Sequence, residues 1–216
     1  MGKTSLHDIA YKTLLERIVS CQYKPGSWLN EELLVEELGV SRTPIRSALI
    51  RLQQENLVEI MPKRGIQVVP VTPNSIRDLF NLRDLIEPYA IYNYADHFEK
   101  DQLLQFLNIF SSQDQSVPPE KTFENDAMFH IAIVSQTRNA LLISYYESMQ
   151  NQLTRIAYMG TAASKRRLAD SNKEHSEILL ALLKDDREEA LEKLRLHLKE
   201  GRESAYQTIL SAGATV

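Results

Sequence analysis

The most informative segment of the chain is Leu38-Gly39-Val40-Ser41-Arg42-Thr43-Pro44-Ile45-Arg46-Ser47-Ala48-Leu49. Gly39 suits a tight turn between two helices, because glycine adopts a positive φ at little cost. Ser41 is a good N-cap, and Pro44 falls in the first helical turn, where a missing N–H group does no harm. The segment therefore predicts the turn and second helix of a helix-turn-helix, the element that enters a DNA major groove.

The residues around this segment complete a small DNA-binding domain. Apolar residues at helical spacing predict a first helix from about Leu6 to Ile18, and Asn30 is expected to cap a second helix. Two strands are expected at 58–61 and 66–69, joined by a tight loop with a basic tip. Three helices followed by a hairpin predict a winged helix-turn-helix, which we assign to residues 1–72.

The side chains expected to contact DNA lie on the second helix of the motif and on the wing. Arginine and threonine there can hydrogen-bond base edges and phosphates, and a basic wing tip can follow the DNA backbone or the minor groove. The expected contacts are Arg42, Thr43, Arg46, Lys63, Arg64 and Gly65.

The chain after residue 72 has only helical patterns. Thr72 is a plausible N-cap and Pro73 a first-turn residue of a helix that continues through Ile86. Further helices are expected at about 100–113, 121–137, 139–158, 165–184 and 186–210. The predicted fold is therefore mainly α: a winged helix-turn-helix plus an all-helical bundle of about six helices at 73–216.

Composition and charge are those of a globular protein with one basic region. The chain has 216 residues, 43 % of them hydrophobic and 25 % charged, with a net charge of −4. Residues 1–72 carry a net charge of +1 and residues 73–216 a net charge of −5, so the positive charge is concentrated where DNA would bind.

Location follows from what the sequence lacks. No apolar run approaches the roughly 20 residues that span a bilayer, and the N-terminus has no signal-peptide core, so we expect a cytoplasmic protein. The single cysteine, Cys21, excludes an internal disulfide and is expected to be a buried thiol.

Three of the five histidines fall on the apolar faces of three different expected helices. These are His130, His175 and His197, and Asp126 precedes His130 by four residues on the same helical face. Burying a carboxylate and three imidazoles without partners is costly, and a shared divalent metal ion removes that cost. The competing interpretation is a set of ordinary core histidines satisfied by hydrogen bonds. We expect His7 and His97 to be exposed.

The N-terminal residues resemble the GntR family of bacterial transcription regulators over roughly residues 5–70. The matching pieces are Pro25-Gly26, 33–38, 39–46 and the wing 62–65. The remainder resembles the FCD effector domain of the FadR subfamily. Its matching pieces are Leu82-Arg83-Asp84 with Glu87, Asp126-x-x-x-His130, Arg138-Asn139, Glu174-His175 and Asp186…Ala190…His197. The short segment Gln115–Pro119 is similar to the compact, six-helix branch of that subfamily.

The resemblance implies roles for individual residues. Asp126, His130, His175 and His197 match metal-ligand positions that are commonly occupied by zinc or nickel. The ligands of the family are small carboxylates or sugar acids bound next to the metal. Arg83 matches a position that often holds a pocket arginine, and Asn139 is a second candidate for contacting the effector. The alternative for Arg83 is a surface ion pair with Glu87.

The resemblance also implies a mechanism. A homodimer would place two recognition helices on a pseudo-palindromic DNA operator, and the bound acid would change operator affinity. We expect a repressor that its metabolite releases, although the residues themselves do not determine that direction. Two other classes remain: a metalloenzyme with an open metal position, and a DNA-binding architectural protein in which the metal only stabilises the bundle.

Overall fold

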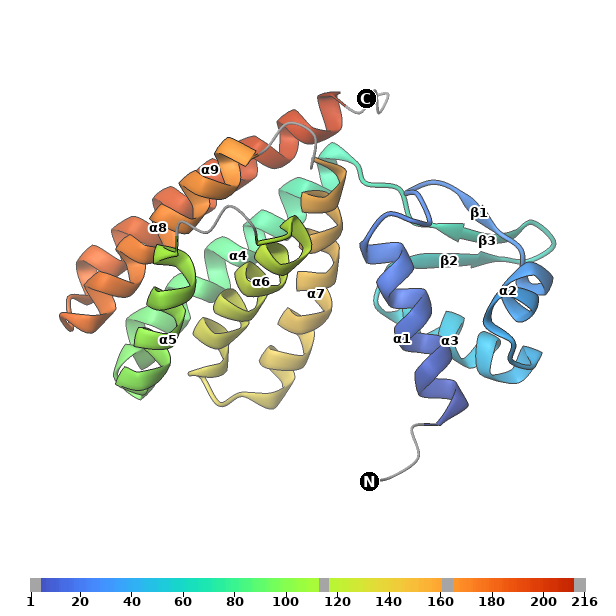
Figure 1. The fold of residues 1–216 in the computed structure, drawn as a ribbon, viewed down its shortest axis with the longest axis horizontal. Helices are drawn as coiled ribbons and strands as arrows, with labels where there is room; N and C mark the ends of the chain where they lie inside the picture. The colour runs from blue at the N-terminus through green and yellow to red at the C-terminus, as the bar shows by residue number, and fades with distance from the viewer. Residues whose placement is uncertain (1–4, 113–116, 161–164, 212–216) are drawn as a thin grey trace. The chain divides into compact units, whose positions relative to one another are not determined.

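The computed structural model describes residues 5–112, 117–160 and 165–211. The expected helix end at residue 113 and positions 115–116 lie outside these described residues. The chain forms two compact units, Met1–Val71 and Thr72–Val216, called here the winged unit and the helical unit (Figure 1). The prediction of a mainly helical chain with an N-terminal winged helix-turn-helix is confirmed.

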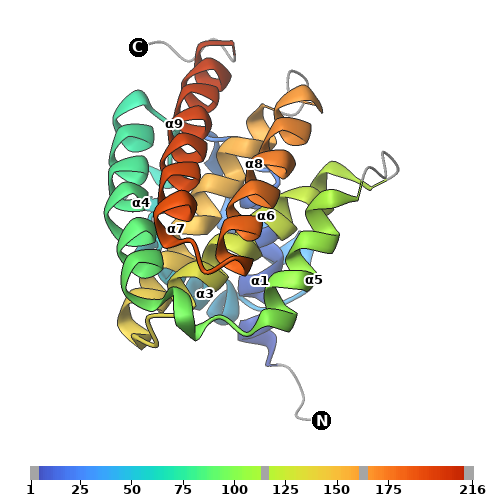
Figure 2. The same ribbon diagram turned by 90° about the vertical axis from the view of Figure 1, so that its left-hand side faces the viewer.

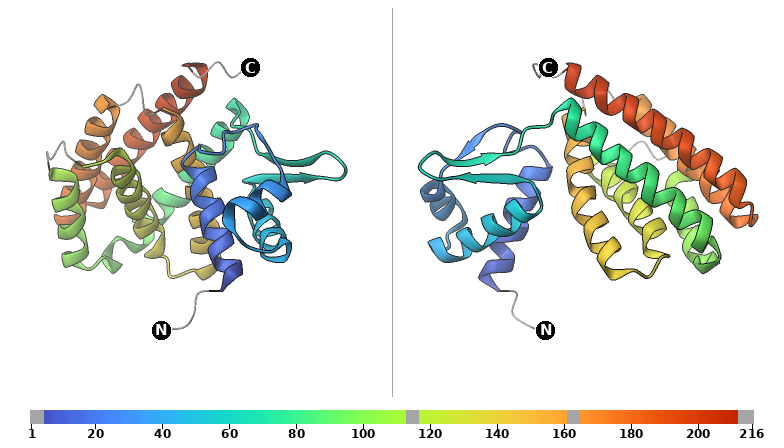
Figure 3. Two further views of the ribbon diagram at one scale, coloured as in Figure 1. Left: turned by 45° about the vertical axis from the view of Figure 1, so that its right-hand side comes forward. Right: turned by 180° about the vertical axis from the view of Figure 1, so that it is seen from behind.

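The winged unit contains three helices and a small antiparallel sheet in the order β1-β3-β2. Its elements are α1 (Leu6–Val19), β1 (Trp28–Leu29), α2 (Glu31–Leu38), α3 (Arg42–Gln54), β2 (Val58–Met61) and β3 (Gly65–Val68). The hairpin of β2 and β3 extends beyond the helices of its unit (Figure 3). The sequence patterns did not predict β1, because its two residues are too few to show an alternation and become a strand only by pairing with β3.

The turn between α2 and α3 follows the chemistry of its residues, with one exception. Gly39 ends α2 at φ +65°, the left-handed conformation that glycine favours, and the Asn30 side chain accepts hydrogen bonds from the first backbone N–H groups of α2. Ser41 occupies the N-cap position of α3, but its side chain makes no capping hydrogen bond. The prediction of the cap position was therefore right, whereas the expected side-chain contact was wrong.

Two further expectations about single residues were wrong. Cys21 is half-buried, because it lies in the turn after α1 at φ +60° and so leaves the buried face of that helix. His97 is also half-buried, and its Nδ1 lies 2.8 Å from the carbonyl oxygen of Gln136. His7 is exposed, as expected.

The core of the winged unit separates the two faces of α3. Ile45, Leu49 and Leu52 are buried with Leu14 and Ile18 of α1. The opposite face of α3 is exposed, and its residues are Arg42, Thr43, Arg46, Ser47 and Ile50. Because α1 covers the apolar face of α3, the arginine-bearing face remains exposed to solvent.

The helical unit is a bundle of six long helices and one short 3₁₀ helix among the described residues. Its elements are α4 (Pro73–Tyr94), η1 (Ala95–His97), α5 (Lys100–Ser111), α6 (Pro119–Ser135), α7 (Ala140–Met159), α8 (Lys165–Leu183) and α9 (Arg187–Ser211). Helix α9 packs against both α4 and α8 (Figure 2). Thr72 and Ser75 form a reciprocal capping box at the start of α4.

The bundle is held together by an apolar core that surrounds the polar site described below. Phe106, Phe110 and Phe129 pack with ring centroids 5.5–6.3 Å apart. Within the described residues, no helix has the length and apolar character that a membrane span requires.

We expect Leu14→Ala to lower the free energy of unfolding of the winged unit by about 2–5 kcal/mol, because Leu14 is fully buried. Trp28 is the one tryptophan of the chain and belongs to β1, so its fluorescence reports denaturant unfolding of this unit. Leu33→Ala is the matched control. Leu33 lies in the same unit but is 61 % exposed, and its truncation is expected to cost less than about 0.5 kcal/mol.

Candidate metal centre and DNA-binding surface

Four side chains that the sequence singled out as metal ligands meet inside the helical unit. Asp126 and His130 come from α6, His175 from α8 and His197 from α9. One potential ligand atom from each lies within 4.8 Å of all the others. The three histidines are buried, whereas Asp126 is partly exposed. Within the part of the chain that the structure describes, Asp126 is thus the most accessible of the four candidate ligands.

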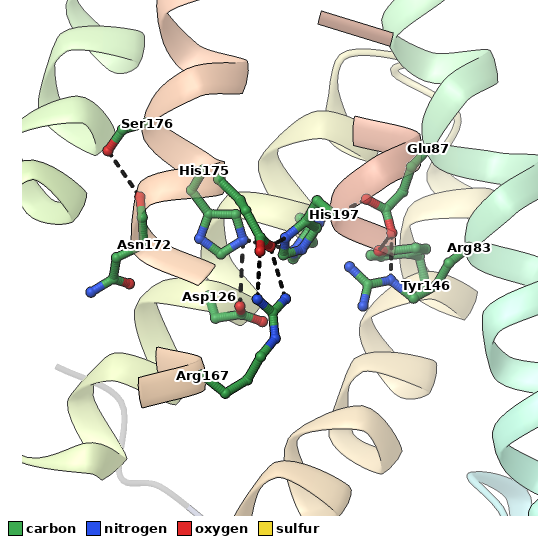
Figure 4. Close-up of polar contacts among 11 residues, drawn as sticks. Arg83, Glu87, Asp126, Tyr146, Arg167, Asn172, His175, Ser176 and His197 are labelled. Carbon is green, nitrogen blue, oxygen red and sulfur yellow. Dashed lines mark hydrogen bonds and ion pairs between the residues drawn. The ribbon is translucent and has the colours of Figure 1, made fainter. Parts of the chain in front are cut away.

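The distances in this cluster suit a metal ion of ordinary size. The three Nε2 atoms of His130, His175 and His197 lie 3.1–3.3 Å from one another. Asp126 Oδ1 lies 3.5 Å from His175 Nε2, and Figure 4 shows the two groups directed at each other. With metal–nitrogen bonds of about 2.05 Å, ligand atoms are about 3.3 Å apart in a tetrahedron and about 2.9 Å apart at neighbouring octahedral positions.

The orientation of His130 is set by a buried carboxylate. His130 Nδ1 lies 2.7 Å from Glu87 Oε2, and both side chains are fully buried. An ionised carboxylate only accepts hydrogen bonds, so Nδ1 must carry the proton. In the neutral ring, Nε2 then has a lone pair that faces the cluster.

His197 is held in the same way from another helix. Its Nδ1 lies 2.7 Å from Glu174 Oε2, and Arg167 donates two hydrogen bonds to Glu174 at 2.6 and 2.8 Å. Figure 4 shows the Arg167 guanidinium directed toward the cluster of His175 and His197. The Nε2 lone pair of His197 therefore also faces the cluster, which is the usual arrangement of histidines that ligate a metal.

The two carboxylates, Glu87 and Glu174, leave acceptor atoms of the histidines directed at one another in the cluster. At least two Nε2 lone pairs converge at 3.1 Å, and neither ring can donate a hydrogen bond to the other. Burial lowers the pKa of His175 and His197 well below the ordinary value, and the neighbouring His130 lowers both further. Neutral imidazoles are the form that binds a metal, so the residues present fit a divalent ion.

Glu87 connects the cluster to a second polar group, Arg83. Glu87 accepts hydrogen bonds from Arg83 Nε and from the Tyr146 hydroxyl, both at 2.6 Å. Burial by itself raises the pKa of Glu87, but the charge of Arg83 and the hydrogen bonds from His130 and Arg83 outweigh it and hold the pKa well below the ordinary value. Glu87 is therefore an anion at neutral pH and can keep all three hydrogen bonds.

A cavity lies beside the cluster, wholly within the helical unit. Asp126 and His197 of the cluster line it, together with Arg83 and Arg167. Its remaining wall is largely apolar, and residues there include Phe80, Phe123, Leu153, Ile156 and Leu168. The Nη2 atom of Arg83 is buried and has no hydrogen-bond partner among the described residues. The cavity thus offers a buried cationic donor close to the candidate metal ligands.

The two residues expected to contact an effector lie in different places. Arg83 does pair with Glu87, but this pair is buried and not on the surface, because α4 turns this face into the bundle. Asn139 is exposed at the start of α7, where its side chain accepts hydrogen bonds from the backbone of Leu141 and Leu142. It is not among the described residues that line the cavity.

All six residues expected to contact DNA are exposed in the winged unit. Arg42, Thr43 and Arg46 share the open face of α3, and Lys63, Arg64 and Gly65 form the tip of the wing. Gly65 has φ +110°, and a side chain there would lie against the ring of Trp28. Glycine at this position therefore keeps the tight turn that exposes the two basic side chains.

Comparison with known families identifies the chain. Residues 6–68 match the family described as bacterial regulatory proteins, gntR family, and residues 78–200 match the FCD domain. The chain belongs to the GntR family. It is a transcription regulator with an FCD effector-binding domain, and its family is one of regulators and not of enzymes.

Individual relatives agree with the family. The chain is 27 % identical to the HTH-type transcriptional repressor RspR of Escherichia coli over 202 residues, 91 % of this chain and 87 % of that protein. It is 41 % identical over 86 residues to an HTH-type transcriptional regulator of Streptomyces ambofaciens. That match spans 40 % of this chain and only 36 % of the relative.

Solved structures share the fold of this GntR-family chain. A GntR regulator from Rhodococcus has a TM-score of 0.79 at 21 % identity and covers 99 % of this chain and all of its own. The Zn²⁺-bound FCD domain of a regulator named TM0439 has a TM-score of 0.51 at 24 % identity and covers 67 % of this chain and 99 % of its own.

Sequence reasoning missed the residues that hold the ligands in place. Glu174 adjoins His175 in sequence but binds His197, and Glu87 pairs with Arg83 at helical spacing but also binds His130. The available signals were the Arg-x-x-x-Glu spacing and a glutamate next to a histidine, and neither indicates which imidazole is contacted. Tyr146 and Arg167 had no signal of their own.

We expect Glu174→Gln to weaken metal binding about 10- to 100-fold, because the amide no longer holds the proton of His197 on Nδ1. Titration of the metal-free protein with Co²⁺, followed by visible absorption, measures the affinity and the ligand geometry. Glu177→Gln is the control, since Glu177 also lies on α8 but pairs with Lys173 and Lys193. Equal affinities in the two variants would contradict the role given to Glu174.

Proposed function

We propose that this GntR regulator is a homodimeric repressor that a small organic acid, bound beside a divalent metal ion, releases from a pseudo-palindromic operator. The observation that carries the proposal is the buried, unpartnered Nη2 of Arg83, in a cavity that also contains Asp126 and His197. In this proposal residues 1–72 read the operator. Residues 73–216 bind the metal and the acid and form the dimer.

Asp126, His130, His175 and His197 would hold the metal. Zinc or nickel suits three imidazoles and one carboxylate. The related FCD domain of TM0439 is Zn²⁺-bound in its solved structure, which supports a metal in this one. When bound, the ion would supply a positive charge in the cavity and a position where an oxygen of the effector can coordinate.

Arg83 is the residue that would recognise the acid. Its Nε is committed to Glu87, so its free Nη2 can donate to a carboxylate in the cavity. The apolar wall, including Phe80 and Phe123, would pack against the carbon skeleton. Asn139 is left out of the proposed effector site, since its side chain caps α7.

Chain connectivity suggests how binding at Arg83 would reach the DNA. Arg83 lies on α4, which begins at Pro73, and only residues 69–72 separate it from the wing strand β3. A shift of α4 would therefore act directly on the end of the winged unit. A typical coupling of about 1–3 kcal/mol corresponds to a change of roughly 5- to 150-fold in operator affinity. The repressor direction is supported by RspR, a relative that is named a repressor.

Operator affinity of the metal-loaded protein is expected to fall roughly 5- to 150-fold in the presence of the fitting acid. A duplex selected from a randomised pool serves as the operator, and fluorescence polarisation measures binding against a panel of dicarboxylates, tricarboxylates and sugar acids. The neutral sugar alcohols are the control, because they lack the group that Arg83 would bind. Unchanged affinity with every acid, together with a metal-dependent rise in Tm, would instead support a metal that only stabilises the bundle.

Arg46→Ala is expected to weaken binding to the selected duplex by about 5- to 150-fold, the effect of losing one bidentate base contact. Arg77→Ala, an exposed arginine at the start of the helical unit, removes the same charge and should leave the affinity nearly unchanged. If both variants bound equally well, Arg46 would have no part in reading the operator.

A further inference from the structure

Both arginines on the exposed face of α3 are paired with glutamates at the start of α2. Arg46 Nε lies 2.9 Å from Glu31 Oε1 and 3.1 Å from its Oε2. Arg42 Nη2 lies 2.9 Å from Glu32 Oε1. The two pairs differ in shielding, because the side chain of Glu31 is 24 % exposed and that of Glu32 is 74 % exposed. The Glu31–Arg46 pair is therefore the better defined of the two.

The local structure explains why two glutamates occupy the start of α2. Glu31 and Glu32 are the first two residues of α2, directly after the Asn30 cap, where negative charge is stabilised by the helix dipole. The turn at Gly39 then brings α3 back beside α2. Glu31 and Arg46 are 15 residues apart in sequence, so the pair forms only when the turn is made.

The atoms used in the Glu31–Arg46 pair leave the rest of the guanidinium available. Glu31 takes Nε, and the described part of the chain offers no other recorded partner to the Arg46 side chain, which is 63 % exposed. The two terminal nitrogens are the donors that can bind guanine O6 and N7 together. A guanidinium held through Nε therefore presents this pair of donors in a restricted orientation.

The same pair reduces what Arg46 can contribute to binding of random DNA. Binding without sequence preference depends on cations that neutralise phosphates, and an arginine already paired with a carboxylate is a weaker contributor. The wing differs in this respect, since Lys63 and Arg64 have no carboxylate partner recorded within the described ranges. General attraction to the backbone thus comes from the wing, while the charge on α3 is balanced locally.

We propose that Glu31 is a specificity-determining residue of the DNA-binding surface. It positions Arg46 for a base edge and withholds the charge of Arg46 from phosphates. Glu32 acts on Arg42 in the same way but more weakly, because both partners are largely exposed. This inference rests on the proposed reading role of Arg46, and it adds that the discrimination between sequences depends on an acidic residue.

The test compares Glu31→Gln with Glu36→Gln in the full-length, metal-loaded protein. Glu36 is exposed on the same helix, and within the described residues no ion pair is recorded for it. Binding is measured to the selected duplex and to a scrambled duplex of equal length at several salt concentrations. Glu31→Gln should lower the ratio of the affinity for the selected duplex to that for the scrambled duplex about two- to fivefold. For the scrambled duplex, the slope of log affinity against log salt concentration should also become steeper, by about the amount expected for one additional phosphate contact.

Glu36→Gln should raise both affinities alike, because it removes the same charge without releasing an arginine. Identical affinity ratios and salt slopes for the two variants would overturn the proposal. Thermal unfolding of both variants, followed by circular dichroism, confirms that each is compared in its folded state.

A double-mutant cycle separates this inference from the function on which it rests. In an Arg46→Ala background, Glu31→Gln should behave as Glu36→Gln does, since no guanidinium remains to be released. If Arg46→Ala weakened binding but Glu31→Gln gave the same affinity ratio and salt slope as Glu36→Gln, only the role of Glu31 would be overturned. No effect of Arg46→Ala on the selected duplex would remove the reading role of Arg46, and the inference would fall with it.

Discussion

The helical unit depends on two carboxylate–imidazole hydrogen bonds that determine where the histidine protons lie. Glu87 holds the proton of His130 on Nδ1, and Glu174 does the same for His197. Both rings must then direct an Nε2 lone pair at the centre of the bundle. Converging lone pairs repel one another, so a cation held among them would stabilise the arrangement. The folded state therefore contains the charge pattern of a metal site.

This constraint extends from the metal site to the cavity beside it. Glu87 accepts hydrogen bonds from His130, Arg83 and Tyr146, and thereby joins helices α4, α6 and α7 through one buried side chain. An acid that bound Nη2 of Arg83 would act on a group that shares this carboxylate with His130, a candidate metal ligand. The metal and the effector would thus influence each other's binding, as linkage requires of any two coupled sites.

Glutamates have a comparable role in the two units. In the helical unit, Glu87 binds Nδ1 of His130 and Glu174 binds Nδ1 of His197, so that Nε2 of each ring faces the cluster. In the winged unit, Glu31 binds Arg46 through Nε, which leaves the outer nitrogens of the guanidinium directed away from the pair. In both cases a carboxylate determines which atoms of a neighbouring side chain remain available to a ligand.

The sequence by itself determined the elements and the types of residue that carry the chemistry. Gly39 at positive φ, the caps at Asn30 and Thr72, and the spacing of buried residues along α3 act within a few residues of chain, so local patterns were enough to predict them. Helical spacing likewise indicated that Asp126 and His130 share a face. The two-residue strand β1 was not predicted, because it becomes a strand only by pairing with β3.

Only the tertiary structure decided which groups meet. Glu174 lies beside His175 in sequence but binds His197, 23 residues away. The spacing of Arg83 and Glu87 also allowed an ion pair on the surface, whereas in the structure this pair is buried, and among the described residues Nη2 of Arg83 has no hydrogen-bond partner. The side chain of Asn139, which the family resemblance suggested as a second candidate for contacting the effector, caps α7. Such contacts depend on how helices distant in sequence pack. The direction and burial of a side chain are properties of that packing, and residue type and periodicity do not contain them.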